Sequence, residues 1–122
     1  MISPQERHDL AKLSPYNLVH LILPEEREFM NRYQSAADFY RTWLAHGILK
    51  QDDAPSYYLL RQTFTDTRGE KRVRKGFLGI SKLPEAGERY VLGHERTFSR
   101  PIQDRLSLTE ATKANLGPVF AL

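Results

Sequence analysis

The stretch that decides the fold is EEREFMNRYQSAADFYRTWLAH, residues 25–46. Its apolar side chains recur at spacings of three and four residues, which places them along one side of an α-helix. These side chains are Phe29, Tyr33, Ala36, Ala37, Tyr40, Trp43 and Leu44. Gly47 follows, and glycine readily adopts the left-handed conformation that ends many helices. The pattern predicts a helix from Glu25 to His46 whose aromatic stripe belongs to the core and not to a ligand site.

Two shorter elements precede this helix. Residues 3–6, with the sequence SPQE, have the pattern of a capping box followed by a helix. We predict that this helix ends near Leu13, because Ser14-Pro15 disfavours a helical backbone at the serine. Residues 16–23 have the composition of a strand, and their apolar members fall on both faces. Such a run is typical of a covered interior strand, so we predict a strand there.

The chain beyond residue 56 is typical of a β-hairpin. Two predicted strands, at about 57–64 and 73–83, flank a polar turn that contains Gly69. Gly76 and Gly79 interrupt the second strand, where glycine often marks a bulge or a close approach by other atoms.

The sequence of the C-terminal part predicts a short strand over residues 89–92 and a last helix that starts near Pro101. Ser99 is placed to cap this helix, and Gly117-Pro118 is placed to end it. The side chains predicted along its buried side are Ile102, Leu106, Thr109 and Leu116.

These elements define an α+β fold in which a small mixed or antiparallel sheet, including the hairpin, packs against two or three helices. The chain has 122 residues, the usual length of one domain, and its 40% apolar content can fill one core. We therefore expect a single domain over residues 1–122.

Composition excludes several classes of function. The chain has no cysteine, which excludes disulfides, thiolate metal sites and a cysteine nucleophile. Its longest apolar run, residues 21–23, is far shorter than the ~20 residues of a membrane-spanning helix. We therefore expect a cytoplasmic protein without a membrane partner. The four histidines are widely spaced, so no metal site is expected either.

The hairpin carries a basic run, and the chain has a formal net charge of +3. The run consists of Arg68, Lys71, Arg72, Arg74 and Lys75. The aromatic residues of the two strands would suit base stacking if they were exposed, and they are Tyr57, Tyr58, Phe64 and Phe77. We expect most of these rings to be buried and the charges to serve solubility. Nucleic acid is therefore not an expected partner.

The densest polar cluster runs from Gly93 to Thr97 and continues with Arg100, Asp104 and Arg105. It combines a base, carboxylates and cations beside a predicted helix start, whose free backbone amides can hold an anion. Phosphoryl transfer needs such a combination. The alternative is a solvated loop in which Glu95 pairs with a neighbouring arginine.

Six segments occur along the chain in an order and spacing that resemble a known family. They are SPYNLVH at 14–20, YYLLRQTF at 57–64, GFLG at 76–79, GHERT at 93–97, DRLSL at 104–108 and NLGPVF at 115–120. The chain resembles, from Ile2 to Leu122, the family called domain of unknown function 1015, which is found widely in prokaryotes.

This resemblance implies a function and a larger parent. Members of the family are longer, so the chain resembles the N-terminal fragment of such a protein. Their later part carries an Asp-Gly-His-His-Arg motif similar to one in the ParB/sulfiredoxin-like group, which includes kinases of free serine. The resemblance thus implies phosphoryl transfer from a nucleotide or pyrophosphate, with Mg, to a small hydroxyl substrate. The motif does not occur in this chain, so the fragment is expected to be inactive without the C-terminal part of its parent chain.

The resemblance also assigns roles to residues of the polar cluster. Glu95 or Asp104 would act as the catalytic base or a metal ligand. The residues expected to bind phosphate or substrate are His94, Arg96, Thr97 and Arg105.

The alternative hypothesis is a non-catalytic docking module. In this hypothesis the hairpin and the apolar tail, residues 119–122, bind another protein or the rest of the parent chain. Such a tail could also allow a homodimer.

Overall fold

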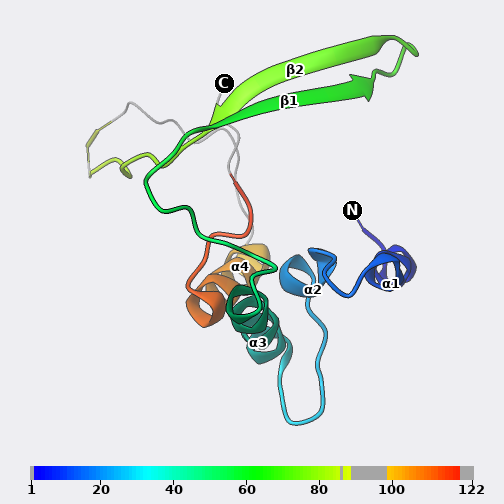
Figure 1. Cartoon of the computed structure of the whole chain (residues 1–122), viewed down its shortest axis with the longest axis vertical. Helices are drawn as coiled ribbons and strands as arrows, with labels where there is room; N and C mark the ends of the chain where they lie inside the picture. The colour runs from blue at the N-terminus through cyan, green and yellow to red at the C-terminus, as the bar shows by residue number, and fades with distance from the viewer. Residues whose placement is uncertain (1, 86, 89–98, 119–122) are drawn as a thin grey trace. The chain divides into compact units, whose positions relative to one another are not determined.

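A computed structural model describes residues 2–85, 87–88 and 99–118 (Figure 1). In chain order its elements are α1 (Pro4–Leu13), α2 (Val19–Ile22), α3 (Arg32–Ala45), β1 (Tyr58–Thr65), β2 (Lys71–Leu78) and α4 (Ser99–Thr112). They form two compact units: a helical unit of Met1–Lys50 with Arg96–Leu122, and a hairpin unit of Gln51–Glu95. The helices and the antiparallel hairpin confirm the α+β class. The packing of the hairpin against the helices and the single domain stay predictions.

The first helix forms as its sequence predicts. The Ser3 hydroxyl accepts a hydrogen bond from the backbone N–H of Glu6 at 3.2 Å, and the Glu6 carboxylate accepts one from the Ser3 N–H at 2.7 Å. These bonds hold the pKa of Glu6 below its usual value. The helix ends at Leu13, and Ser14 is extended because Pro15 follows.

The strand predicted over residues 16–23 is wrong, because Val19–Ile22 form a single helical turn instead. The Asn17 side chain accepts a hydrogen bond from the backbone N–H of Val19 at 3.0 Å, and the Leu23 N–H bonds to the Val19 carbonyl at 3.0 Å. Short apolar runs fit a buried helical turn as well as a strand, so their composition alone does not distinguish the two.

The long helix α3 begins at Arg32 and not at Glu25, which corrects the predicted start. Asn31 caps it, because its side-chain oxygen accepts hydrogen bonds from the backbone N–H groups of Tyr33 and Gln34, both at 3.0 Å. Phe29 therefore lies outside the helix, has a φ of 62° and is 95% exposed, so it does not belong to the buried stripe.

The end of α3 confirms the predicted glycine cap. Gly47 has a φ of 70°. The N–H of Ile48 bonds to the carbonyl of Trp43 at 2.8 Å, and the N–H of Gly47 bonds to that of Leu44 at 3.1 Å. This pair of bonds is the Schellman motif, which satisfies carbonyls that the helix itself leaves unpaired.

The core of the helical unit lies where α3 contacts α2 and α4. Its buried apolar residues are Val19, Leu21, Ala36, Ala37, Trp43 and Leu108. Aromatic rings extend this core. The centre of the Phe39 ring lies 5.0 Å from the centre of the His20 ring and 5.9 Å from the centre of the Trp43 ring. Of the predicted stripe, Ala36, Ala37 and Trp43 are buried, whereas Phe29 and Leu44 are exposed, so only part of it forms the core.

The buried side of α4 differs from the prediction. Ile102 and Leu106 are about half exposed, whereas Leu108 and Thr112 are buried. The helix also ends at Thr112, before Gly117-Pro118. Thr112 lies one turn after Leu108, and its hydroxyl donates a hydrogen bond to the Leu108 carbonyl at 2.8 Å. Apolar spacing alone misses a buried side that contains a polar side chain.

The hairpin pairs β1 with β2 in antiparallel register, from Tyr58 opposite Leu78 to Thr65 opposite Lys71. This confirms the hairpin, although its second strand ends five residues before the predicted end at 83. The register runs through Gly76 without a bulge. At Gly79 an added Cβ would lie 2.8 Å from atoms of the Tyr57 ring, so the close approach predicted there is present.

Three further predictions concern the hairpin unit and the chain as a whole. The aromatic residues of the hairpin are exposed, and their predicted burial is wrong: Tyr57 is 76% exposed, Tyr58 53%, Phe64 40% and Phe77 72%. The strand predicted over residues 89–92 lies outside the described residues. Within the described part of the chain, no helix is long and apolar enough to span a membrane.

Candidate functional site

The structure describes two of the six residues predicted to carry chemistry. Asp104 and Arg105 lie in the first half of α4. Residues 94–97, the other four, lie outside the described residues. The site is therefore built from the two that are described and from what surrounds them.

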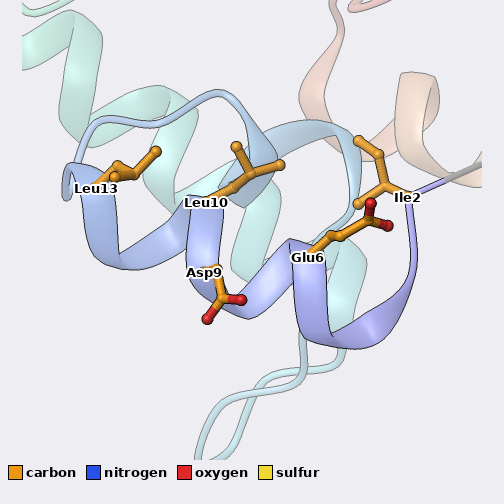
Figure 2. A pocket seen from close by; sticks show the side chains of 5 residues that line it. All are labelled: Ile2, Glu6, Asp9, Leu10 and Leu13. Carbon is orange, nitrogen blue, oxygen red and sulfur yellow. The ribbon is translucent and has the colours of Figure 1, made fainter.

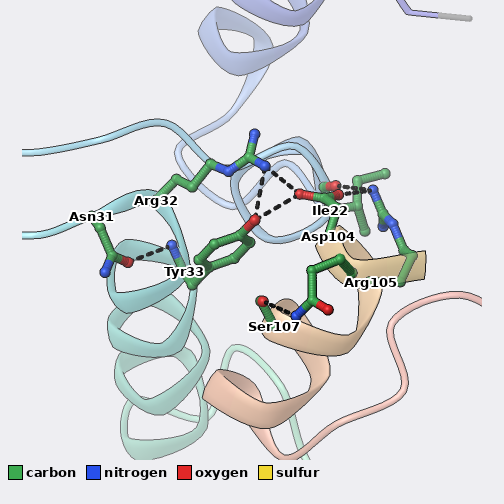
Figure 3. Close-up of polar contacts among 8 residues, drawn as sticks. Ile22, Asn31, Arg32, Tyr33, Asp104, Arg105 and Ser107 are labelled. Carbon is green, nitrogen blue, oxygen red and sulfur yellow. Dashed lines mark hydrogen bonds and ion pairs between the residues drawn. The ribbon is translucent and has the colours of Figure 1, made fainter. Parts of the chain in front are cut away.

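Asp104 forms a network with the first two residues of α3 (Figure 3). The Tyr33 hydroxyl donates a hydrogen bond to Asp104 Oδ1 at 3.0 Å, and Arg32 Nη2 forms an ion pair with the same oxygen. Arg32 also donates to the Tyr33 hydroxyl at 2.8 Å. This last bond and the charge of Asp104 raise the pKa of the Arg32 guanidinium above its usual value, so it stays charged.

Arg105 and Arg7 are held by consecutive backbone carbonyls at the end of α2. Arg105 Nη2 donates to the Ile22 carbonyl at 3.2 Å and lies 3.4 Å from Asp104 Oδ2. Arg7 Nε donates to the Leu23 carbonyl at 3.0 Å, and its Nη1 pairs with Glu25 Oε2 at 2.6 Å. The side chain of Arg7 is only 10% exposed, so this guanidinium has a fixed orientation.

The three arginines line one open pocket of about 260 Å³, the arginine pocket. Its lining includes Arg7, Arg32 and Arg105 with two carboxylates, Glu25 and Asp104, so cations outnumber anions. A guanidinium has five N–H donors, and the described contacts use one or two of them on each arginine. The remaining donors can form bidentate hydrogen bonds with an anion, as arginine does with phosphate and carboxylate groups.

A second hollow, of about 340 Å³, runs along α1 (Figure 2). It is lined by Ile2, Glu6, Asp9, Leu10 and Leu13, so its floor is aliphatic and its only charges are negative. Glu6 is already used by the capping box. This hollow does not suit an anion.

The sequence did not indicate Arg7, Arg32 or Tyr33 as site residues. Arg7 lies in a helix 98 residues before Arg105, and Arg32 lies 72 residues before Asp104, so no local spacing relates them. Tyr33 belongs to the apolar stripe, and its hydroxyl turns to Asp104 only because α3 packs beside α4. Among the described residues, no group of three or more metal-binding side chains could hold a metal ion.

The fold and the pocket define a small α+β protein with a pocket lined by three arginines. A family model matches residues 1–122, and the chain belongs to this family, which is described as protein of unknown function (DUF1015). No curated protein and no solved structure gave a significant match to the chain.

Proposed function

We propose that the chain is part of an enzyme that transfers a phosphoryl group to a small hydroxyl compound such as free serine. The arginine pocket would hold the phosphate group of the donor or the product. The observation that supports this most is the convergence of Arg7, Arg32 and Arg105, from separate segments of the helical unit, on one pocket.

The orientation of these arginines suits the chemistry. Phosphoryl transfer depends mainly on positioning and on cations that stabilise the charge of the transferred group. The Leu23 carbonyl and Glu25 fix the guanidinium of Arg7, and the Ile22 carbonyl and Asp104 hold that of Arg105. Side chains that are already ordered lose little conformational entropy when an anion binds.

Asp104 has a positioning role in this proposal. One of its oxygens accepts a hydrogen bond from Tyr33 and pairs with Arg32, and the other lies beside Arg105. Both oxygens of this carboxylate are engaged by neighbouring side chains, so we assign it to orienting them. Glu95 is then the stronger candidate for the base, with His94 and Arg96 as further phosphate contacts.

The proposal includes a nucleotide or pyrophosphate with Mg as donor, a relation to the ParB/sulfiredoxin-like group, and a cytoplasmic location in a prokaryote. The sequence has no Asp-Gly-His-His-Arg motif. We therefore expect this chain to bind the phosphate compound without turnover.

The test is a thermal-unfolding screen of the chain with inorganic phosphate, pyrophosphate, ADP and ATP, each with and without Mg. A ligand at a hundred times its Kd should stabilise the fold by about 2.7 kcal/mol. Arg105→Gln should weaken binding about tenfold or more, since it removes a guanidinium that binds phosphate in the pocket.

Arg41→Gln is the matched control, because Arg41 is exposed on α3 and does not line the pocket. It should leave the affinity unchanged within about twofold. The absence of any shift with all four compounds would overturn the proposal, and so would an equal loss of affinity in both variants.

A further inference from the structure

The two faces of the hairpin differ in how their charges are compensated. Side chains alternate between the faces of a strand, and residues directly opposite each other share a face. The register therefore places on one face, the basic face, the side chains of Leu59, Arg61, Thr63, Thr65, Lys71, Val73, Lys75 and Phe77.

The opposite face satisfies its cations internally. Arg72 Nε donates to Asp66 Oδ2 at 2.9 Å, and Arg72 also pairs with Glu70. The guanidinium of Arg74 lies over the Phe64 ring, 5.4 Å from its centre. Each cation of this face therefore has an interaction partner within the hairpin.

The basic face carries cations without partners. Arg61 lies directly opposite Lys75 in the register, an arrangement of like charges that destabilises a hairpin. Lys71 follows on the same face, roughly 13 Å from Lys75 along the strand. Among the described residues, the side chains of these three form no hydrogen bond or ion pair. An anionic partner would remove the repulsion that the fold retains here.

Exposed aromatic rings adjoin these cations. Phe77 follows Lys75 by two positions on the same face, and the Tyr57 ring meets the Phe77 ring edge to face at 6.2 Å between centres. Both rings are more than 70% exposed. Rings beside unpaired cations are the combination that binds single strands of nucleic acid, with bases stacked on the rings and phosphates on the cations.

We propose that the basic face of the hairpin binds single-stranded nucleic acid without sequence preference. Phosphates would lie on Arg61, Lys71 and Lys75, and one or two bases would stack on Phe77 and Tyr57. From 57 to 83 the chain carries seven basic residues and two acidic ones, which disfavours a second copy of the same hairpin as the partner. An acidic protein would satisfy the cations but would leave the stacking rings unexplained.

The test measures fluorescence anisotropy of labelled single strands of about 12 nucleotides, oligo-dT and oligo-U, with the whole chain. If three phosphates are neutralised, the logarithm of the association constant should fall with the logarithm of the salt concentration with a slope of about −2. A rise from 50 to 200 mM salt should therefore weaken binding roughly fifteenfold. Arg61→Gln with Lys75→Gln should reduce the slope to about −0.7. Phe77→Leu should weaken binding at least about fivefold at constant salt, because it removes a stacking ring.

The matched control is Arg41→Gln with Lys50→Gln, which removes two exposed charges from the helical unit and should leave the salt slope unchanged. The Arg61 and Lys75 changes remove a like-charge pair, so the hairpin should remain folded, which its strand amide signals in NMR spectra can verify. Absence of binding at 50 mM salt, an equal loss in the control, or full competition by an oligo-glutamate peptide of the same length would overturn the proposal. The last outcome would indicate an acidic protein partner.

Discussion

At the scale of single residues, Asn31 connects local helix chemistry to the arginine pocket. Its side chain caps α3, and the next two residues, Arg32 and Tyr33, are the ones that contact Asp104. The cap therefore fixes both the start of the helix and the direction in which two site residues project.

Replacement of this cap gives a direct measure of its contribution. Asn31→Ala leaves the N–H groups of Tyr33 and Gln34 without their side-chain acceptor, so we expect the free energy of unfolding to fall by about 1 kcal/mol. Urea denaturation followed by circular dichroism measures the change. Asn31→Asp should retain the stability, because aspartate caps equally well. A similar loss in both variants would show that the carboxamide acts by another contact.

At the scale of elements, α2 has an importance that its length does not suggest. This single turn contributes Val19 and Leu21, and Leu21 is fully buried. Its last residue, Ile22, and its C-cap residue, Leu23, supply the carbonyls that hold Arg105 and Arg7. Core packing and site geometry thus meet in residues 19–23.

Leu21→Ala tests this importance. The deletion leaves a cavity in the core, and we expect a loss of about 2–5 kcal/mol in the free energy of unfolding. Leu13→Ala is the matched control, because Leu13 is 77% exposed and its truncation should cost less than about 0.5 kcal/mol. Urea denaturation of both variants gives the comparison, and equal losses would contradict the assignment of Leu21 to the core.

How far the sequence predicts these elements depends on whether the signal is local. The capping box of α1, the glycine end of α3 and the hairpin all depend on neighbouring residues, and all were predicted. The strand predicted over residues 16–23 is wrong, because the interactions that fold this segment into a helical turn come partly from packing on α3. The predicted start of α3 at Glu25 is too early, because the apolar pattern begins at Phe29, ahead of the cap at Asn31 that starts the helix.

The turn of the hairpin should respond to pH. Asp66 accepts hydrogen bonds from the backbone N–H groups of Arg68 and Glu70 at 2.9 and 3.0 Å, and from Arg72 Nε at 2.9 Å. The bond from Arg72, followed by that from the Glu70 backbone, holds the pKa of Asp66 below its ordinary value of 3.8. A carboxylate with a lowered pKa in the folded state stabilises the fold above the pKa of the unfolded state and loses this effect as pH falls through the folded value.

We therefore expect the hairpin to be unaffected between pH 7 and about 5 and to weaken as the pH falls below 3.8. Backbone amide chemical shifts of Thr65 and Lys71 report the strand pairing nearest the turn. Asp66→Asn should abolish this titration, whereas Asp53→Asn, an exposed position before the hairpin, should leave it unchanged. A titration that persists in Asp66→Asn would assign the effect to another group.

At the scale of the whole molecule, burial is confined to one unit. Every buried residue among those described lies in the helical unit, and the described residues 51–88 include none. The arginine pocket is lined by this unit alone, whereas the unpaired cations and exposed rings belong to the hairpin. The candidate site was only partly predictable from the sequence. Arg7, Arg32 and Arg105 come together only through the packing of the helices, and their spacing along the chain does not indicate this.

This division predicts that the two proposed activities are separable. We expect a chain in which residues 51–95 are replaced by a flexible Gly-Ser linker of about 12 residues, which reaches ~20 Å, to keep its helices and one cooperative urea transition. Phosphate binding should persist in it, because the three arginines remain, and oligonucleotide binding should disappear with the basic face. Circular dichroism, thermal shifts with pyrophosphate and anisotropy with oligo-dT measure the three properties on one sample. Loss of the cooperative transition would mean instead that the hairpin stabilises the helices, and the single domain expected from the sequence would then describe the chain better than two independent units.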